Sequence, residues 1–167
     1  FMADTHVQEN PSATDIAEIT RLSAEEVRSF GLEPKAALLS HSNYGTHQSD
    51  SAIKMREALK IIRKQLPELE IDGEMHADLA VSEVLRNKRF PDSNLEGPAN
   101  LLVMPNQDAA NIAFNLLKAL GDGIIIGPVL MGTAKPAHIV TSSISVRGLL
   151  NMTALAIVRS NKERTQP

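Results

Sequence analysis

Cysteine is absent from the sequence, so disulfide scaffolds, thiol nucleophiles and thiolate metal sites are excluded. The chain also lacks an apolar run of about 18 residues and a basic-then-apolar leader, which argues against a membrane span and a secretory signal. The 17 lysine and arginine residues are scattered, so the basic stripe of a nucleic-acid-binding protein is lacking. These absences predict a cytoplasmic protein without a membrane or nucleic-acid partner.

What the sequence does contain is typical of a folded domain: 167 residues, 43% of them hydrophobic, with a net charge of −3. It begins with Phe1-Met2-Ala3-Asp4, an apolar start that is neither an initiator methionine nor a polar terminus. We therefore expect a fragment of a longer protein. The last segment, RSNKERTQP, shifts in composition and is expected to fray. We predict one domain over residues 1–158, followed by a tail over residues 159–167.

Short apolar runs alternate with segments of helical periodicity. After a short strand at residues 1–7, the first helix is expected to start at Ser12 or Thr14 and to stop at Gly31, and Pro67 is expected to end the second. Further helices are predicted in HADLAVSEVLRNKRF, DAANIAFNLLKALG and residues 145–158. The runs AALLS, LEIDG, ANLLVM and GIIIGPV are predicted to be buried strands, with AHIVT extended. This alternation predicts an α/β fold with a mostly parallel sheet and helices on both faces.

Ligands bind beyond the carboxyl ends of the strands in such sheets, so the loops after the strands form the candidate site. No metal site is expected, because the loop histidines lack the spacing of metal ligands. The acidic loop DGEMHAD carries Asp72, Glu74 and Asp78, which suit either acid–base chemistry or a divalent cation. The favoured interpretation is structural: a tight turn at Gly73, Asp78 near a helix start and Glu74 in a hydrogen bond.

Other polar side chains stand near predicted helix starts. Asn106 and Asp108 either cap a helix or leave its N–H groups to an anionic ligand. Ser145 has the serine of a capping box, but Gly148 stands where the box needs an acid. The glycines of GIIIGPVLMG match neither the dinucleotide-binding fingerprint nor the P-loop pattern.

The hydroxyl cluster before the last helix has three interpretations: caps, ligand contacts or nucleophiles. A nucleophilic Ser142 or Ser143 needs a base, and His138 is the nearest candidate on the preceding extended segment. The sequence favours caps or polar ligand contacts for these hydroxyls.

Five ordered blocks of the sequence resemble one family. They are ALLSHSNYG, EIDGEMHAD, GPANLLVMPNQDAANIA, GIIIGPVLMGTAKPAHIV and SVRGLLNMTALA, and they cover nearly the whole chain. They resemble the phosphate acetyl/butyryl transferases, and more closely the phosphotransacetylase-like C-terminal domain of bacterial NADP-dependent malic enzymes. The resemblance implies the second half of an isocitrate/isopropylmalate dehydrogenase-like phosphotransacetylase fold, with the first half preceding Phe1 and the final helix returning to pack against it.

The chain departs from that family where the family carries its chemistry. In the stand-alone transferases, the segment after Lys-Pro resembles the motif Ser-Arg-Gly-x-Ser-x-x-Asp. The family assigns the serine and arginine to the acyl-phosphate and CoA site, and the aspartate to activation of the CoA thiol. In this chain, the serine is replaced by Thr141 and the arginine by Ser142. The glycine is replaced by Ser143 and the aspartate by Gly148. A serine cannot form the bidentate fork of a guanidinium and a glycine cannot accept a proton, so no catalytic residue is expected.

What the resemblance retains is a cleft for an acyl-CoA. The implied role is regulatory: the domain binds acetyl-CoA, favours one conformational state of a malic enzyme and contributes to a homo-oligomer of at least two subunits. No cofactor is expected in this chain, whereas NADP and a divalent metal are expected in a preceding domain that oxidatively decarboxylates malate to pyruvate. The implied acyl-CoA contacts are Ser42, Asn43, Asn106, Asn111, Lys135, Thr141, Ser142 and Ser143.

Two alternatives remain open. An active phosphate acetyl/butyryl transferase would use a rearranged set of residues, such as Thr141 with Lys135, and would form acetyl-CoA from CoA and acetyl phosphate. A purely structural dimerisation module with a vestigial pocket would give a flat titration with acetyl-CoA.

Overall fold

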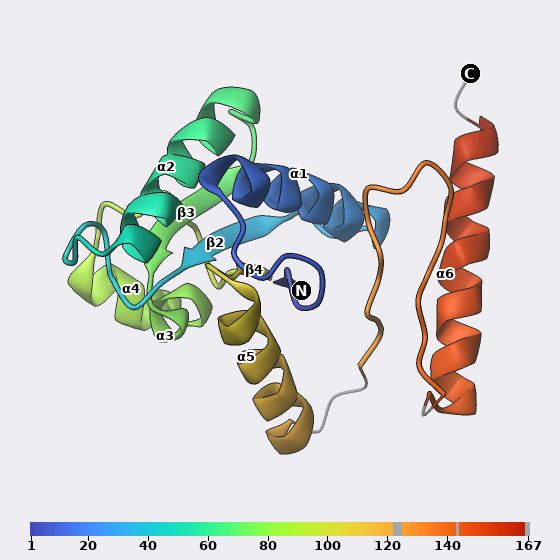
Figure 1. Ribbon diagram of the computed structural model, residues 1–167. Coiled ribbons are helices and arrows are strands. Elements are labelled where there is room, and N and C mark those ends of the chain that lie inside the picture. The colour runs from blue at the N-terminus through green and yellow to red at the C-terminus, as the bar shows by residue number, and fades with distance from the viewer. Residues whose placement is uncertain (122–124, 143, 166–167) are drawn as a thin grey trace. The chain divides into compact units, whose positions relative to one another are not determined.

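The computed structural model describes residues 1–121, 125–142 and 144–165 (Figure 1). The chain divides into two compact units, residues 1–115 and 116–167, and the division falls within α5 (Gln107–Leu120). The first unit contains the sheet, and the second contains an irregular segment and helix α6 (Val146–Thr165). No helix in the described ranges is both long and apolar enough to cross a membrane.

The first unit is built on a four-stranded parallel sheet in the order β1-β4-β2-β3. Its strands are β1 (Met2–Ala3), β2 (Lys35–Leu39), β3 (Glu70–Met75) and β4 (Leu101–Val103). Strand β2 lies inside the sheet: Ala37 pairs with Asp72 of β3 on one side and with Leu102 of β4 on the other. The predicted α/β class and parallel sheet are confirmed.

Helices cover both faces of this sheet, as predicted. Helices α1 (Ala13–Ser29) and α2 (Asp50–Gln65) pack on one face, and α3 (Ala77–Val81) and the first turn of α5 pack on the other. Helix α4 (Glu83–Arg89) follows α3 directly. The single helix expected here is divided because Ser82 ends α3 and then caps α4, its hydroxyl accepting a hydrogen bond from the Leu85 amide.

The ends of α1 and α2 follow the signals read in the sequence. Ser12 caps α1: its hydroxyl accepts from the Asp15 amide at 3.2 Å, and the Asp15 carboxylate accepts from the Ser12 amide at 2.9 Å. Gly31 follows the end of α1 with a left-handed φ of +76°. Helix α2 ends at Gln65, shortly before Pro67. Ser12, of the two expected starts, is the correct one.

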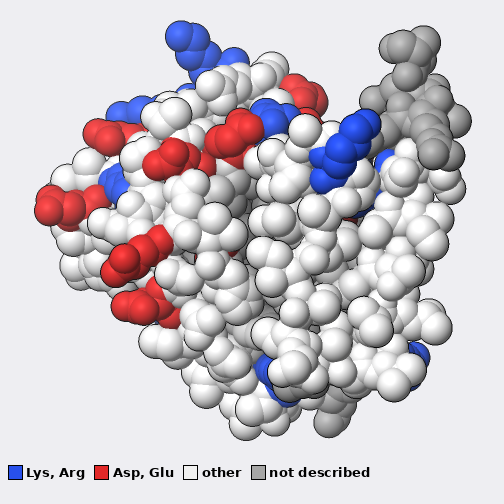
Figure 2. Space-filling model, turned by 45° about the vertical axis from the view of Figure 1, so that its right-hand side comes forward, with Lys and Arg blue, Asp and Glu red and all other residues white. Residues whose placement is uncertain are grey.

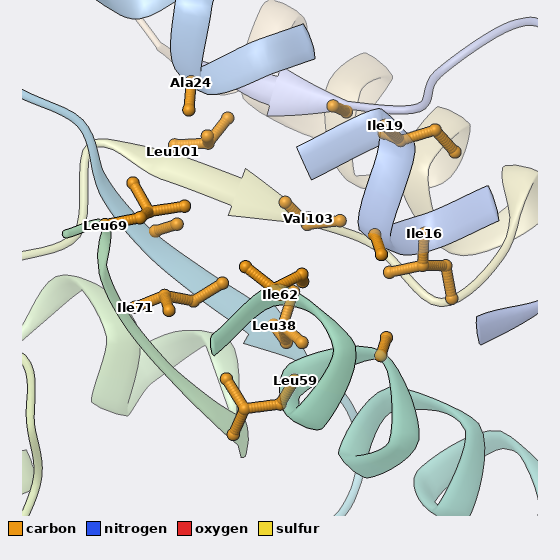
Figure 3. Close-up of a cluster of buried hydrophobic side chains, with 14 of the residues drawn as sticks. Ile16, Ile19, Ala24, Leu38, Leu59, Ile62, Leu69, Ile71, Leu101 and Val103 are labelled. Carbon is orange, nitrogen blue, oxygen red and sulfur yellow. The ribbon is translucent and has the colours of Figure 1, made fainter. Parts of the chain in front are cut away.

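Side chains alternate along β2, and this alternation divides the core into two clusters. Leu38 packs with Ile16 of α1 and Ile62 of α2 on one face of the sheet (Figure 3). Ala37 and Leu39 pack on the other face, in a cluster completed by Met75, Leu79, Ala80, Met104 and Ala110. Burying each large apolar side chain contributes about 1.5–3 kcal/mol to folding. The two clusters hold the strands whose ends form the site.

The structure corrects several predicted details. The run GIIIGPV is not a strand over residues 125–129, and Ile126 is 51% exposed; its residues 123 and 124 lie outside the described ranges. AHIVT is likewise irregular. An apolar run becomes a strand only where a neighbouring strand satisfies its backbone, and the described part of the chain pairs none with these residues.

Two further corrections concern Gly73 and the chain end. Gly73 lies within β3, not in a tight turn; its φ is +144°, and a Cβ atom there would come within 2.7 Å of the Leu38 carbonyl oxygen. Glycine is needed because the two strand backbones approach so closely. Helix α6 starts at Val146, close to the predicted residue 145, and ends at Thr165, beyond the predicted end at residue 158.

Candidate functional site

The chain leaves two neighbouring strands toward opposite faces of the sheet. Helix α2 follows β2 and packs on one face, whereas α5 follows β4 and packs on the other. In α/β proteins such a reversal marks the place where ligands bind, beyond the carboxyl ends of the two strands. The candidate site is therefore formed by residues 40–49 after β2 and residues 104–106 after β4.

Lys54 of α2 connects the start of that helix to the loops after β1 and β4. Its ammonium group donates to the Asn10 side-chain oxygen and to the Pro105 carbonyl oxygen, both at 2.8 Å. Burial lowers the pKa of Lys54. The loops after three different strands are thus held at one edge of the sheet.

A buried carboxylate on β3 organises the loop after β2. Oε1 of Glu74 accepts hydrogen bonds from the Ser42 hydroxyl at 2.6 Å, the Gly45 amide at 2.9 Å and the Arg56 guanidinium at 2.8 Å. The Glu74 side chain is fully buried, and Arg56 of α2 is its counter-charge. The expected hydrogen bond of Glu74 is confirmed.

A second buried carboxylate on the same strand holds the same loop from another side. Oδ2 of Asp72 accepts from the Tyr44 hydroxyl at 3.0 Å, the Ser93 hydroxyl at 2.7 Å and the Asn94 amide at 2.9 Å. Arg63 of α2 pairs with Oδ1 at 3.0 Å. Burial, with the nearby Asp72 charge, raises the pKa of Tyr44 to about 12.

Three imidazoles lie along the same edge. The rings of His41 and His47 are 5.3 Å apart between centroids, and Nε2 of His76 lies 2.8 Å from the His41 carbonyl oxygen. Within the described residues, no three His, Cys, Asp or Glu side chains are grouped so that they could hold a metal ion. Asp78 stands in the first turn of α3, as expected.

The predicted contacts in the first unit serve mainly to build its loops and helix ends. The Ser42 hydroxyl is fully buried, and Oδ1 of Asn43 accepts a hydrogen bond from the His76 amide at 2.7 Å. Oδ1 of Asn106 accepts from the Ala109 amide at 2.9 Å, so Asn106 caps α5. Asn111, partly exposed on α5, accepts at Oδ1 from the Asn115 side chain at 2.9 Å.

The remaining predicted contacts belong to the second unit. Lys135, Thr141 and Ser142 are exposed on the irregular segment before α6, and Ser143 lies outside the described residues. The expected half of a capping box is present: the Ser145 hydroxyl accepts a hydrogen bond from the Gly148 amide at 3.0 Å. This cap fixes where α6 begins.

The sequence analysis did not predict the two ion pairs between α2 and β3. Arg56 and Arg63 are seven residues apart on one helix, and Asp72 and Glu74 are two residues apart on one strand, so each pair shares a face. Two arginines on one helix face and two carboxylates on one face of an otherwise apolar strand are a signal for ion pairs between the two elements. The pairing itself becomes visible only once α2 lies against β3.

Known proteins resemble the chain over almost its whole length. A family model described as phosphate acetyl/butaryl transferase matches residues 1–157. The NADP-dependent malic enzyme of Escherichia coli (strain K12) is 54% identical over 100% of this chain and 22% of its own length, and the match is to its C-terminal region. The phosphate acetyltransferase of Paracoccus denitrificans is 36% identical over 96% of this chain and 51% of its own.

The fold is likewise that of solved phosphotransacetylases. The EutD phosphotransacetylase from Staphylococcus aureus superposes with a TM-score of 0.87 at 31% identity, over 96% of this chain and 49% of that one. The chain thus spans about half of these transferases and about a fifth of the malic enzymes that it matches. From its sequence, its parallel sheet and these matches, the chain belongs to the phosphate acetyl/butaryl transferase family and is homologous to the C-terminal region of malic enzymes.

Proposed function

We propose that this chain is the regulatory and oligomerisation region of an NADP-dependent malic enzyme, which binds acetyl-CoA and does not catalyse acyl transfer. The observation that carries the proposal is the 54% identity over the whole chain to a malic enzyme, against 36% to a phosphate acetyltransferase. In this proposal the preceding part of the protein binds NADP and a divalent metal and converts malate to pyruvate.

Residues just before α6 and in its first turn support the absence of transferase chemistry. Ser142 stands where the transferases are expected to carry an arginine, and Gly148 where they are expected to carry an aspartate. Without a guanidinium the phosphate loses a bidentate partner, and without a carboxylate the CoA thiol has no base at this position. The Gly148 amide is engaged by the Ser145 hydroxyl as a helix cap, which is a structural role.

Acetyl-CoA is proposed to bind at the carboxyl ends of the strands. Asn106 and Asn111 are the proposed direct contacts there. The family resemblance separately implicates Lys135, as the cation for a phosphate, and the hydroxyls of residues 141–143. Ser42 and Asn43 are proposed to act indirectly, because their side chains already hold the loop after β2. Tighter binding to one conformational state would make acetyl-CoA a regulator of malate turnover.

The apolar side of α6 is proposed to be covered by the preceding half of the fold or by a second subunit. Val146, Leu150 and Ile157 are 85%, 65% and 56% exposed, and they line a shallow groove together with Leu149, Thr153 and Ala154. Large areas of the face drawn in Figure 2 carry no charged side chain. Exposed apolar side chains grouped along one helix are typical of a surface that another protein region covers. We propose at least a dimer, which sedimentation of the full-length protein at micromolar concentrations tests.

The test of regulation uses the full-length protein and follows NADP reduction with malate while acetyl-CoA is titrated. Lys135→Ala should raise the acetyl-CoA concentration needed for half-maximal response about tenfold, the effect of losing one charge-assisted hydrogen bond, and should leave turnover without acetyl-CoA nearly unchanged. A second variant combines Lys135→Ala with Asn106→Ala. Asn106→Ala is not used alone, because it also removes the cap of α5. Lys88→Ala, an exposed lysine on α4, is the control. An unchanged response in both variants refutes the assignment.

An active transferase is the second candidate, favoured by the family match over residues 1–157. It predicts that CoA and acetyl phosphate form a thioester, measured by absorbance. Efficient acetyl transfer by the unaltered full-length protein would overturn the regulatory proposal. A flat acetyl-CoA titration together with absent transfer would instead support a purely structural dimerisation role.

A further inference from the structure

The loop from Ser42 to His47 uses all of its own backbone N–H groups. Two of them donate to Glu74: the Tyr44 amide to its carbonyl oxygen at 2.8 Å and the Gly45 amide to its carboxylate at 2.9 Å. The other four donate to groups within or beside the loop, namely the hydroxyl oxygens of Ser40, Ser42 and Thr46 and the carbonyl oxygen of Asn43. The loop therefore has no main-chain donor left for an external ligand.

The donors around Glu74 have the composition of a small-anion site. One hydroxyl, one backbone amide and one guanidinium converge on a single oxygen at 2.6–2.9 Å, which is the range of charge-assisted hydrogen bonds. The loop backbone there is left-handed at two successive residues, with φ of +48° at Tyr44 and +88° at Gly45. Donors brought together in this way are found where proteins bind carboxylates and phosphates.

Glu74 occupies this site as a tethered ligand. Its side chain comes from β3, is fully buried and reaches the loop across 32 residues of sequence. Only Oε1 receives the donors; Oε2 is buried and has no hydrogen-bond partner among the described residues. The neighbouring Asp72 has its own donors and its own arginine, so it does not share the site.

We propose that the loop of residues 42–47 is an anion-binding site for a small carboxylate, and that the protein's own Glu74 side chain is its resident anion. The loop takes its conformation only when a carboxylate is in place, because otherwise Arg56 has no counter-charge and the Gly45 amide has no acceptor. Glu74 is thus a positioning residue, which holds the loop of residues 42–47 at the carboxyl end of β2. The proposal is independent of acetyl-CoA binding, since it concerns a site filled from within.

The experiment removes the tethered anion and supplies a free one. Glu74→Ala deletes the atoms of an acetate ion, so acetate should refill the site. In the full-length variant, cleavage by chymotrypsin after Tyr44, followed by mass spectrometry, should be at least about tenfold faster than in the wild type, because losing one hydrogen bond to a charged group shifts a local opening equilibrium by about that factor. Added acetate should slow this cleavage toward the wild-type rate.

Matched controls separate refilling from general effects. Acetamide, which has the shape of acetate without its charge, and chloride at equal ionic strength should protect much less. Glu70→Ala removes another ion-paired glutamate of β3, the partner of Lys35, and should show no acetate-dependent protection at Tyr44. If cleavage of Glu74→Ala is no faster than that of the wild type, or if acetate leaves it unchanged, the proposal is wrong.

A second variant covers the case in which Glu74→Ala does not fold. Glu74→Gln keeps the size and one acceptor oxygen but removes the charge opposite Arg56. Cleavage after Tyr44 should then be several-fold faster than in the wild type and insensitive to acetate, because the amide still fills the site. A Glu74→Gln protein protected as fully as the wild type would show that no anion is required, which overturns the proposal.

Discussion

The Tyr44 hydroxyl donates a hydrogen bond of 3.0 Å to Oδ2 of Asp72, across 28 residues of sequence. It also lies 3.2 Å from the Ser93 hydroxyl, and its ring lies against Phe90 with centroids 4.6 Å apart. One side chain thus joins the loop after β2 to β3 and to the segment before β4. The relationship makes Tyr44 a measurable reporter of this loop.

The Tyr44 hydroxyl should ionise only at high pH, and its ionisation should destabilise the folded protein. Burial raises its pKa from 10.0 to about 12 in the folded protein. The folded value lies above the unfolded one, so its contribution to stability is complete below pH 10 and is lost as the pH rises toward 12. The difference in tyrosinate absorbance between wild type and Tyr44→Phe measures the ionisation. A titration of Tyr44 centred near pH 10 would contradict this.

Gly73→Ala should destabilise the protein more than Gly45→Ala. Both glycines have positive φ, but only at Gly73 would a Cβ atom meet backbone, 2.7 Å from the Leu38 carbonyl oxygen; at Gly45 it meets nothing within 4 Å. Left-handed strain alone costs about 1–2 kcal/mol, and displacing β2 should add about 1–3 kcal/mol. Urea unfolding of the two variants provides the comparison. Equal losses of unfolding free energy in the two variants would mean that β2 moves away from β3 at little cost.

Arg86→Met should destabilise the first unit strongly. The guanidinium is fully buried and donates to the carbonyl oxygens of Leu79, Leu95 and Gly97 at 2.6–2.9 Å, tying α3 to the loop before β4. Leaving several buried carbonyls unpaired should cost about 3–5 kcal/mol, measured by denaturant unfolding. The exposed Lys88 on the same helix provides the control, because Lys88→Met should cost no more than about 0.5 kcal/mol.

Gly148→Asp should stabilise the start of α6. The Ser145 hydroxyl already accepts from the Gly148 amide, and an aspartate there can accept a hydrogen bond from the Ser145 amide, which completes the capping box. The new Cβ would lie 2.9 Å from Cγ1 of Ile144 and 3.2 Å from the Ser145 hydroxyl oxygen, so the Ile144 side chain must shift, which reduces the gain. We expect a gain of about 0.5–2 kcal/mol. Gly148→Ala, which cannot complete the box, is the matched control, and an equal gain there would exclude the capping explanation.

The same variant bears on the proposed absence of transferase chemistry. Combined with Ser142→Arg, it supplies the guanidinium and carboxylate that the transferases are expected to carry. We expect tighter CoA binding, measured by calorimetry on the full-length protein, with little or no acetyl transfer, because other groups must also be correctly placed for proton transfer. Efficient transfer by the double variant would show that these two residues are all that the chemistry lacks.

Features set by neighbouring residues were determined by the sequence alone. The stop at Gly31 and the end of α2 before Pro67 depend on hydrogen bonds and backbone angles within about one helical turn, whereas the sequence narrowed the start of α1 only to Ser12 or Thr14. The alternation of apolar runs and helical segments determined the α/β class in the same way, because periodicity reports which face is buried. The five ordered sequence blocks were sufficient to identify the family.

Features set by distant residues were decided only by the tertiary structure. The hydrogen bond from the Ser42 hydroxyl to Glu74 could not be predicted, because no local pattern pairs residues 32 apart. Likewise GIIIGPV is as apolar as the true strands, but over residues 125–129 it forms no strand. A strand requires a partner for its backbone and a buried carboxylate requires a counter-charge, and both partners are chosen when distant segments pack together.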